Sequence, residues 1–182
     1  MIKKKTSKLI RLSKKNNFTL SVAESCTGGL LSSSIIQESG ASNFFHMGFI
    51  TYSNKAKINI LSVNSNIIKK YGAVSEETAL EMVKGVYKKT KSDLSISITG
   101  VAGPRGGTKI NPVGTVCFGI GINCKDKPII YKTIKKKFNL RTRIGIQRKS
   151  VVFVLDNLIE IILTHMLWCP WLALGASILH PT

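Results

Sequence analysis

The sequence has few acidic residues, cysteines and histidines, and each shortage excludes a class of protein. Only 9 of its 182 residues are Asp or Glu, against 27 Lys or Arg, which gives a formal charge of +18. The four cysteines form no Cys-x-x-Cys pair and the three histidines are far apart, so neither a zinc site nor a dithiol redox pair is indicated. Residues up to Asn17 are mostly polar or basic, so the start lacks the apolar core of a signal peptide. We expect a cytoplasmic protein that needs no metal and no cofactor.

Aromatic residues are also scarce, at 7% of the chain, and they do not alternate with the basic ones. An excess of positive charge favours nucleic acid, anionic membrane or phosphorylated ligands. Abundant Lys, Ile, Asn and Ser are equally what an AT-rich coding sequence produces. We therefore expect that nucleic acid is not required, and keep as an alternative a catalytically silent binding module whose basic surface engages nucleic acid.

Strand-like and helix-like segments alternate along the chain, and 43% of its residues are hydrophobic. This length and composition favour a single globular domain over residues 1–164. The alternation predicts an α/β fold, a layered α/β/α sandwich with a mixed, largely parallel sheet. Expected helices are 6–16, 27–38, 55–61, one starting at Ser75 and a last one over about 143–163; expected strands are 18–23, 44–52, 94–99, 113–122 and 128–134.

The end of the chain, residues 165–182, is an atypical hydrophobic tail. No charged residue follows Glu160, and the run 161–179 approaches the roughly 20 residues needed to span a bilayer. Thr164, His165 and Pro170 within that run argue against a span. We interpret the tail as a poorly packed or interfacial extension and keep membrane contact through 161–179 as the less favoured alternative.

Ser25 lies where an apolar strand-like run ends in the small and hydroxyl residues of Val22–Gly29 and a helical pattern follows. Unpaired N–H groups at the start of a helix can stabilise a developing negative charge, which suits a nucleophile at this position. Hydroxyl residues at such junctions more often cap the helix, so Ser25 or Thr27 could be an N-cap. Cys26 is a second candidate nucleophile, because a thiol at a helix N-terminus can have a lowered pKa.

A serine nucleophile needs a base, and no histidine lies near Ser25 in the sequence. The segment from Tyr52 to Lys57 follows a predicted strand, and neighbouring parallel strands would bring its start beside Ser25. A lysine acts as a base only when burial or a nearby positive charge lowers its pKa. The spacing does not discriminate between Lys55 and Lys57.

Glycine is concentrated in a second segment, residues 99–107, directly after the alternating strand 94–99. Main-chain N–H groups of such a loop can bind phosphate or ribose. A tight structural turn would have the same composition, so both interpretations stay open.

Five segments together resemble one known family, in the same order along the chain. They are AESCTGG (23–29), GFITYSNKAK (48–57), YGAVSEETALEM (71–82), SISITGVAGPRGG (95–107) and NPVGTVCFG (111–119). These segments are similar to those of the CinA C-terminal family, whose members include nicotinamide-nucleotide amidase, and the resemblance extends over about residues 6–164. It implies an α/β fold and a metal-independent serine amidase. The implied reaction is hydrolysis of the carboxamide of nicotinamide mononucleotide to nicotinic acid mononucleotide and ammonia.

The resemblance also implies roles for individual residues. Ser25 matches the nucleophile, Lys57 the lysine that acts as base, and Tyr52 the tyrosine that relays a proton or orients the lysine, whereas Lys55 falls at a variable position. Main-chain N–H groups would form an oxyanion hole at Cys26, Thr27, Gly28 and Gly29. Substrate binding is expected at Thr99, Gly100, Gly103, Gly106, Gly107, Thr108 and Arg143. We expect a small-molecule substrate, nicotinamide mononucleotide, and a homo-oligomeric assembly.

The chain departs from the family pattern at two places. Arg105 stands in the glycine-rich loop where relatives often have an acidic or hydroxyl residue, so substrate selectivity could differ. Before the last helix the family commonly has Gly-Asp-Arg, whereas this chain has the sequence Phe138 to Arg143, in which only Arg143 matches, with an offset. A phosphate-binding role for Arg143 is therefore an open expectation.

Overall fold

Five strands form one mixed sheet in the computed structural model, which describes residues 1–124 and 127–172. The sheet order is β2-β1-β3-β4-β5, and β4 is antiparallel to both of its neighbours, so the other four strands point the same way. This arrangement confirms the predicted mixed, largely parallel sheet. The strands are β1 (Leu20–Glu24), β2 (Phe45–Ile50), β3 (Leu94–Gly100), β4 (Thr115–Ile122) and β5 (Ile130–Lys137).

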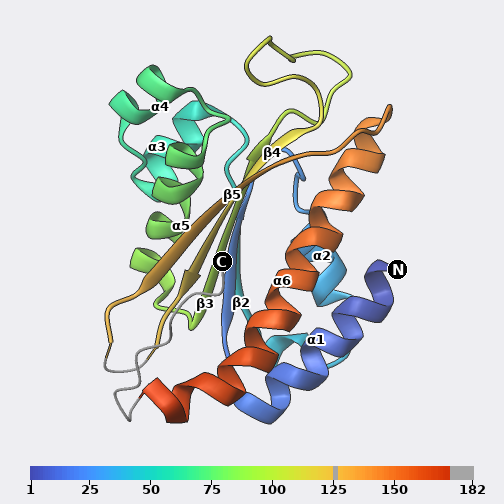
Figure 1. Ribbon diagram of the computed structural model, residues 1–182, viewed down its shortest axis with the longest axis vertical. Helices are drawn as coiled ribbons and strands as arrows, with labels where there is room; N and C mark the ends of the chain where they lie inside the picture. Colours follow the sequence, from blue (N-terminus) through green and yellow to red (C-terminus); the bar gives the residue numbers. More distant parts are fainter. Residues whose placement is uncertain (125–126, 173–182) are drawn as a thin grey trace.

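Helices cover both faces of the sheet (Figure 1). One face carries α1 (Ile2–Asn16), α2 (Leu30–Ile36) and α6 (Arg143–Leu172), and the other carries α3 (Asn54–Leu61), α4 (Ser65–Tyr71) and α5 (Glu76–Thr90). A short 3₁₀ helix, η1 (Ala41–Asn43), precedes β2. The predicted α/β/α layering is therefore confirmed.

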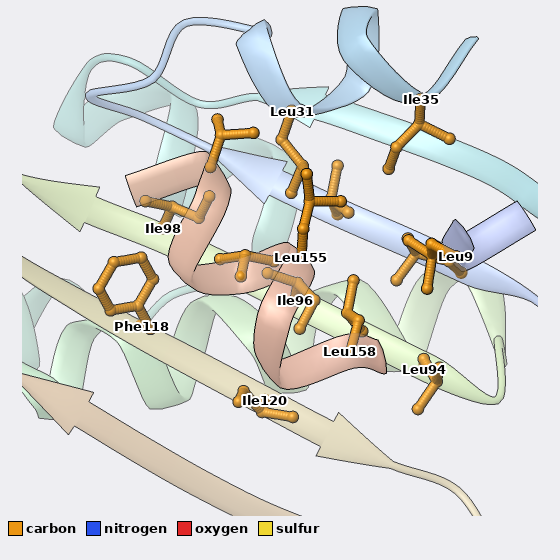
Figure 2. Packing of buried hydrophobic residues seen from close by; sticks show 14 of the residues in the cluster. Leu9, Leu31, Ile35, Leu94, Ile96, Ile98, Phe118, Ile120, Leu155 and Leu158 are labelled. Atoms are coloured by element: carbon orange, nitrogen blue, oxygen red, sulfur yellow. The ribbon is translucent and has the colours of Figure 1, made fainter. Parts of the chain in front are cut away.

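The larger hydrophobic core lies between the sheet and the face that carries α1, α2 and α6 (Figure 2). Apolar side chains of β3 and β4 point toward this face and pack against those of the three helices. The labelled members are Leu9, Leu31, Ile35, Leu94, Ile96, Ile98, Phe118, Ile120, Leu155 and Leu158. A smaller cluster on the opposite face, around Met82 and Val86 of α5, fixes α3 and α4 through Leu61 and Ile68. Both helical layers are thus attached to the sheet by buried apolar surface.

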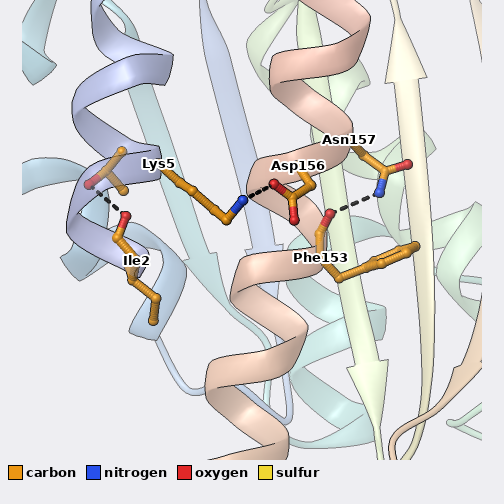
Figure 3. Close-up of polar contacts among 6 residues, drawn as sticks. Ile2, Lys5, Phe153, Asp156 and Asn157 are labelled. Carbon is orange, nitrogen blue, oxygen red and sulfur yellow. Dashed lines mark hydrogen bonds and ion pairs between the residues drawn. The ribbon is translucent and has the colours of Figure 1, made fainter.

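Polar contacts add to this packing at the helix pair α1 and α6. Lys5 of α1 forms an ion pair with Asp156 of α6 (Figure 3). One residue further along α6, Asn157 Nδ2 donates a hydrogen bond to the carbonyl of Phe153 at 2.8 Å. The Lys5–Asp156 pair is partly exposed, so its contribution to stability is modest, about 0–1 kcal/mol.

Several element boundaries differ from the expected ones. Helix α1 begins at Ile2 rather than at residue 6, and α4 was not expected at all. Helix α2 begins at Leu30 rather than at residue 27, because Gly28 and Gly29 have φ of 60° and 95°, a left-handed conformation that delays the helix. The expected cap of α5 is confirmed: Ser75 Oγ accepts a hydrogen bond from the N–H of Thr78 at 3.1 Å.

The last helix continues beyond the expected end at residue 163 and runs to Leu172. The first part of the hydrophobic tail is therefore helical, and residues 173–182 lie outside the described residues. In the part of the chain that the structure describes, no helix has the length and apolar character needed to cross a bilayer.

The sheet topology brings three loops to one edge. Strand β1 pairs in parallel with β2 on one side and with β3 on the other, so their carboxyl ends lie together. The segments that follow these strands are 25–29, 51–53 and 101–114, which contain the candidate nucleophile, Tyr52 and most of the glycine-rich loop. The expectation that Tyr52 would come beside Ser25 at neighbouring strand ends agrees with this topology.

Candidate active site

Ser25 is the first residue after β1, and a turn of residues 25–29, which we call the nucleophile turn, joins that strand to α2. The N–H of Ser25 donates to the carbonyl of Ile98 in β3 at 2.9 Å, and its own carbonyl accepts from the N–H of Gly28 at 3.1 Å. Ser25 and Thr27 are both buried, and neither hydroxyl caps α2. Ser25 Oγ is therefore available for chemistry.

Glu24, the last residue of β1, does the capping instead. Its carboxylate is fully buried and accepts from the main-chain N–H groups of Gly29 and Leu31 at 3.1 Å, and from Ser32 through both its N–H at 2.8 Å and its hydroxyl at 2.7 Å. A negative charge at the start of a helix is favoured by the helix dipole and by the unpaired N–H groups there. Glu24 thereby ties the end of β1 to α2 and determines the path of the nucleophile turn.

These hydrogen bonds change the expected oxyanion hole. The N–H groups of Gly28 and Gly29 already donate to Ser25 and Glu24, so the expectation that they contribute free donors is wrong for this conformation. The N–H groups of Cys26 and Thr27 donate to no other residue in the described part of the chain. Two of the four expected donors, adjacent in the chain and next to Ser25, thus have N–H groups that donate to none of the described residues.

Lys57 lies in the first turns of α3 and extends its side chain to Ser25. Its Nζ is 3.0 Å from Ser25 Oγ, 3.0 Å from the carbonyl oxygen of Thr51 and 3.3 Å from that of Tyr52. The side chain is only 1% exposed, and this burial lowers the pKa of Lys57 below 10.5, because the charged ammonium loses its hydration.

The surroundings of Lys57 Nζ suit the neutral amine. A neutral amine has two N–H donors and one lone pair, and the carbonyls of Thr51 and Tyr52 can accept from both donors. The lone pair is then left for the hydroxyl of Ser25. Of the two lysines that the spacing left open, Lys57 contacts Ser25, whereas Lys55 is exposed.

Tyr52 contributes to this arrangement through its main chain. Its carbonyl accepts the hydrogen bond from Lys57, whereas its side chain is 65% exposed and lines the cavity beside Ser25. The phenol has no hydrogen bond to Lys57 or Ser25 within the described residues. The contact that the structure shows between Tyr52 and Lys57 is thus made by the main-chain carbonyl and not by the phenol.

Cys26 also lies at the site, but its thiol is a poor nucleophile here. Burial raises the pKa of Cys26 to about 12, so the reactive thiolate is scarce at neutral pH. Burial outweighs any lowering of the Cys26 pKa by the start of α2, and the nearby Glu24 carboxylate raises this pKa further. Ser25 is the better candidate.

A cavity of about 330 Å³ opens in front of Ser25 and Lys57. The guanidinium groups of Arg105 and Arg143 line it beside the amine of Lys57, and no Asp or Glu of the described residues belongs to its lining. This volume is within the range of small-molecule sites, and the sign of its charge suits an anionic ligand.

Only part of the glycine-rich loop lines the cavity. Gly100, Gly103 and Gly106 line it as expected, as does Thr99, whose hydroxyl donates to the carbonyl of Ala73 at 2.7 Å. Gly107 and Thr108 do not line it, because this part of the loop turns back on itself through a hydrogen bond from the N–H of Thr108 to the carbonyl of Asn111 at 3.0 Å. The expected contact of Gly107 and Thr108 with substrate is therefore not supported.

Arg143 begins α6 and lies at the cavity, as expected. Its Nη1 donates to the carbonyl of Gly103 at 2.8 Å, so part of the guanidinium holds the glycine-rich loop against α6. Arg105, from the same loop, lines the cavity and is exposed.

The sequence analysis missed two residues that help to position the site. One is Glu24, whose position three residues before the expected start of a helix at residue 27 was a usable signal. The other is Gln147 of α6, whose Nε2 donates to the carbonyl of Cys26 at 2.8 Å. Gln147 is 121 positions away from Cys26 in the chain, and nothing in the local sequence indicates this contact.

Comparisons with known proteins match the chain to one family. The family model described as CinA C-terminal domain matches residues 2–162. A CinA-like protein of Kosmotoga olearia is 44% identical over 149 residues, which cover 81% of this chain and 34% of that protein. Another from Chloroherpeton thalassium is 50% identical over 114 residues, 63% of this chain and 27% of that protein. The chain thus spans about a third of the length of these curated relatives.

Solved structures show the same fold at full domain length. A competence-damaged protein (CinA) superfamily protein from Klebsiella pneumoniae has a TM-score of 0.83 at 29% identity, covering 90% of this chain and 99% of that one. A competence-damaged protein (CinA) superfamily protein from Escherichia coli has a TM-score of 0.81 at 35% identity, covering 88% and 90%.

Proposed function

The chain belongs to the CinA C-terminal domain family, and from that premise we propose that it is a serine amidase that hydrolyses the carboxamide of nicotinamide mononucleotide. One observation carries the proposal: the buried amine of Lys57 lies 3.0 Å from Ser25 Oγ. Burying an amine costs free energy unless it is compensated, and a catalytically silent binding module gives no reason to bury it against a hydroxyl.

The reaction follows from the contacts of these two residues. Neutral Lys57 removes the proton of Ser25 as Oγ attacks the amide carbon, and the N–H groups of Cys26 and Thr27 stabilise the oxyanion. Lys57, now protonated, gives its proton to the departing ammonia. Water then hydrolyses the acyl-enzyme with Lys57 again acting as base, and this step releases the carboxylate product and regenerates Ser25.

The cavity supports a substrate that carries a phosphate. Arg105 and Arg143 provide positive charge beside Ser25, and no carboxylate opposes them in the cavity lining. Guanidinium groups bind phosphate through paired N–H donors.

Cys26 and Cys117 are free thiols in the structure, which is consistent with the proposed location in a reducing cytoplasm.

The test is release of ammonia and nicotinic acid mononucleotide from nicotinamide mononucleotide by the purified protein. Ser25→Ala removes the nucleophile, so we expect kcat to fall by roughly 10³-fold or more. Cys26→Ser tests whether Cys26 is the nucleophile instead of Ser25, and this variant should retain activity. Ser33→Ala is the matched control, because Ser33 is an exposed serine of α2. Absence of turnover in the wild type, or turnover that survives Ser25→Ala, would contradict the proposal.

A further inference from the structure

A second cavity, which we call the α1–α6 cavity, has a volume of about 530 Å³ and shares no lining residue with the cavity at Ser25. Its lining comes from the start of α1, from Leu140 in the segment before α6 and from the first turns of α6. The two helices lie side by side here (Figures 1 and 3). This volume is within the range of small-molecule sites and is much larger than an inorganic anion needs.

The charges around the α1–α6 cavity are all of one sign. Lys3, Arg148 and Lys149 line it, and no Asp or Glu of the described residues belongs to its lining. None of these three side chains forms an ion pair with a described residue. Lys5, two positions after Lys3 on the same helix, is by contrast paired with Asp156 of α6. The contact between the two helices thus neutralises one lysine and leaves three cations around the cavity, where an anion would be attracted.

Apolar side chains complete the lining of the same cavity. Ile2, Leu140 and Val152 belong to it, and Leu140 is 37% exposed to solvent. A ligand that covers these side chains gains free energy from the apolar surface removed from water. An inorganic anion would contact only the basic side chains. The lining therefore fits a ligand that is negatively charged in one part and apolar in another.

We infer that the α1–α6 cavity binds a nucleotide, with its phosphate groups at the three basic side chains and its base against the three apolar ones. Arginine binds phosphate through paired N–H donors, and lysine binds it as a compact positive charge. A fatty acid has a single negative charge and would leave two of the three cations unmatched. A nucleoside diphosphate has a flat base, a suitable size and more than one negative charge. The inference does not depend on the proposed amidase activity.

Helix α6 connects the α1–α6 cavity with the candidate active site. Arg143 and Gln147, one helical turn apart, donate to the carbonyls of Gly103 and Cys26 at the active site. Val152 is nine positions after Arg143, or about two and a half turns, so these two residues lie on opposite faces of α6. A nucleotide bound between α1 and α6 would thus contact the same helical turns that hold the glycine-rich loop and the nucleophile turn.

Isothermal titration calorimetry of the full chain with ADP tests the inference. Pyrophosphate and adenosine each provide only one part of the ligand, so each should bind at least roughly tenfold more weakly than ADP. Lys3→Ala and Arg148→Ala should each weaken ADP binding by roughly tenfold, because each removes a charge-assisted contact with phosphate. Their circular dichroism spectra and their amidase activity without ADP should match those of the wild type.

Two control variants show where ADP binds. Lys4→Ala removes the same charge from the same helix, and Lys4 is exposed and does not line the cavity. Arg105→Ala removes a cation from the cavity at Ser25, which could also attract phosphate. Both variants should bind ADP as tightly as the wild type does.

Four results would overturn the inference. The first is a wild type that does not bind ADP at millimolar concentration. The second is pyrophosphate or adenosine that binds as tightly as ADP, because one part of the lining would then make no contact. The third is equal weakening in Lys4→Ala and Arg148→Ala, which indicates unspecific attraction to the net charge of +18. The fourth is loss of binding in Arg105→Ala, which places ADP in the cavity at Ser25.

Discussion

Replacing Glu24 with alanine tests whether its buried carboxylate holds the nucleophile turn in place. The substitution leaves the N–H groups of Gly29, Leu31 and Ser32 without their acceptor. A buried N–H group without a partner costs about 1–3 kcal/mol, so the three together cost roughly 3–9 kcal/mol. Water that enters the space left by the side chain can accept some of these bonds, so we expect a value near the lower end.

A loss of about 3 kcal/mol corresponds to a fall in Tm of roughly 6–12 °C for a domain of this size. Thermal unfolding followed by circular dichroism measures it. The matched control is Glu160→Ala, because Glu160 is an exposed glutamate of α6, and its free energy of unfolding should change by no more than about 0.5 kcal/mol.

Glu24→Gln keeps the shape of the side chain and guards against a variant that does not fold. Its amide oxygen can still accept from Ser32, but its NH₂ group then faces the N–H groups of Gly29 and Leu31. We expect a Tm between those of the wild type and Glu24→Ala, and slower hydrolysis of nicotinamide mononucleotide. A Tm for Glu24→Ala within about 2 °C of the wild type would refute this reasoning, because it leaves less than ~1 kcal/mol for the three N–H groups that lose their acceptor.

Two further predictions concern groups that contact Ser25 or its turn. Because the pKa of Lys57 is lowered, the activity of the wild type should rise with pH through a midpoint below 10.5, and an activity that does not change with pH would contradict this. Lys57→Arg should be inactive at every pH, because a guanidinium stays protonated. Lys57 keeps its proton up to about pH 10.5 in the unfolded state but loses it at a lower pH in the folded state. The free energy of unfolding is therefore lowered most below the folded-state pKa, and it rises with pH between that pKa and 10.5. Gln147→Leu removes one hydrogen bond of about 1 kcal/mol from Cys26, so Tm should fall by roughly 2–4 °C. Because this bond holds the turn that carries Ser25, kcat should fall with KM nearly unchanged, and an unchanged kcat would exclude a positioning role.

The sheet and most helices were predictable because their signals are local. Alternating residues from Leu94 to Thr99 indicated β3, and Ser75 followed by two glutamates indicated the start of α5. The start of α2 was predicted three residues too early, because the left-handed conformation of Gly28 and Gly29 is a property of the turn and not of the helical pattern. Helix α4 was missed because it has only seven residues, too few for a clear periodicity.

The sequence predicted the part of the candidate site that depends on which strands are neighbours, but not the part that depends on how the helices pack. Parallel pairing of β1 with β2 places Tyr52 near Ser25, and this could be expected from the strand ends. The selection of Lys57 over Lys55 depends on which side chain of α3 faces the sheet, and spacing alone did not decide it. The contact of Gln147 with Cys26 depends on the docking of α6 over the nucleophile turn, which no local pattern encodes.

Glu24 and Lys57 are the two buried charged side chains of the site, and their hydrogen bonds assign them different tasks. Four donors surround the carboxylate of Glu24, so its position is fixed and the turn that carries Ser25 is fixed with it. Among the described residues, two carbonyls accept from the amine of Lys57, and its third neighbour is Ser25 Oγ. A fully bonded group next to the nucleophile provides geometry, whereas an incompletely bonded amine retains a lone pair for proton transfer. Substitutions at Glu24 should therefore reduce stability and activity together, while substitutions at Lys57 should abolish activity with a much smaller change in stability.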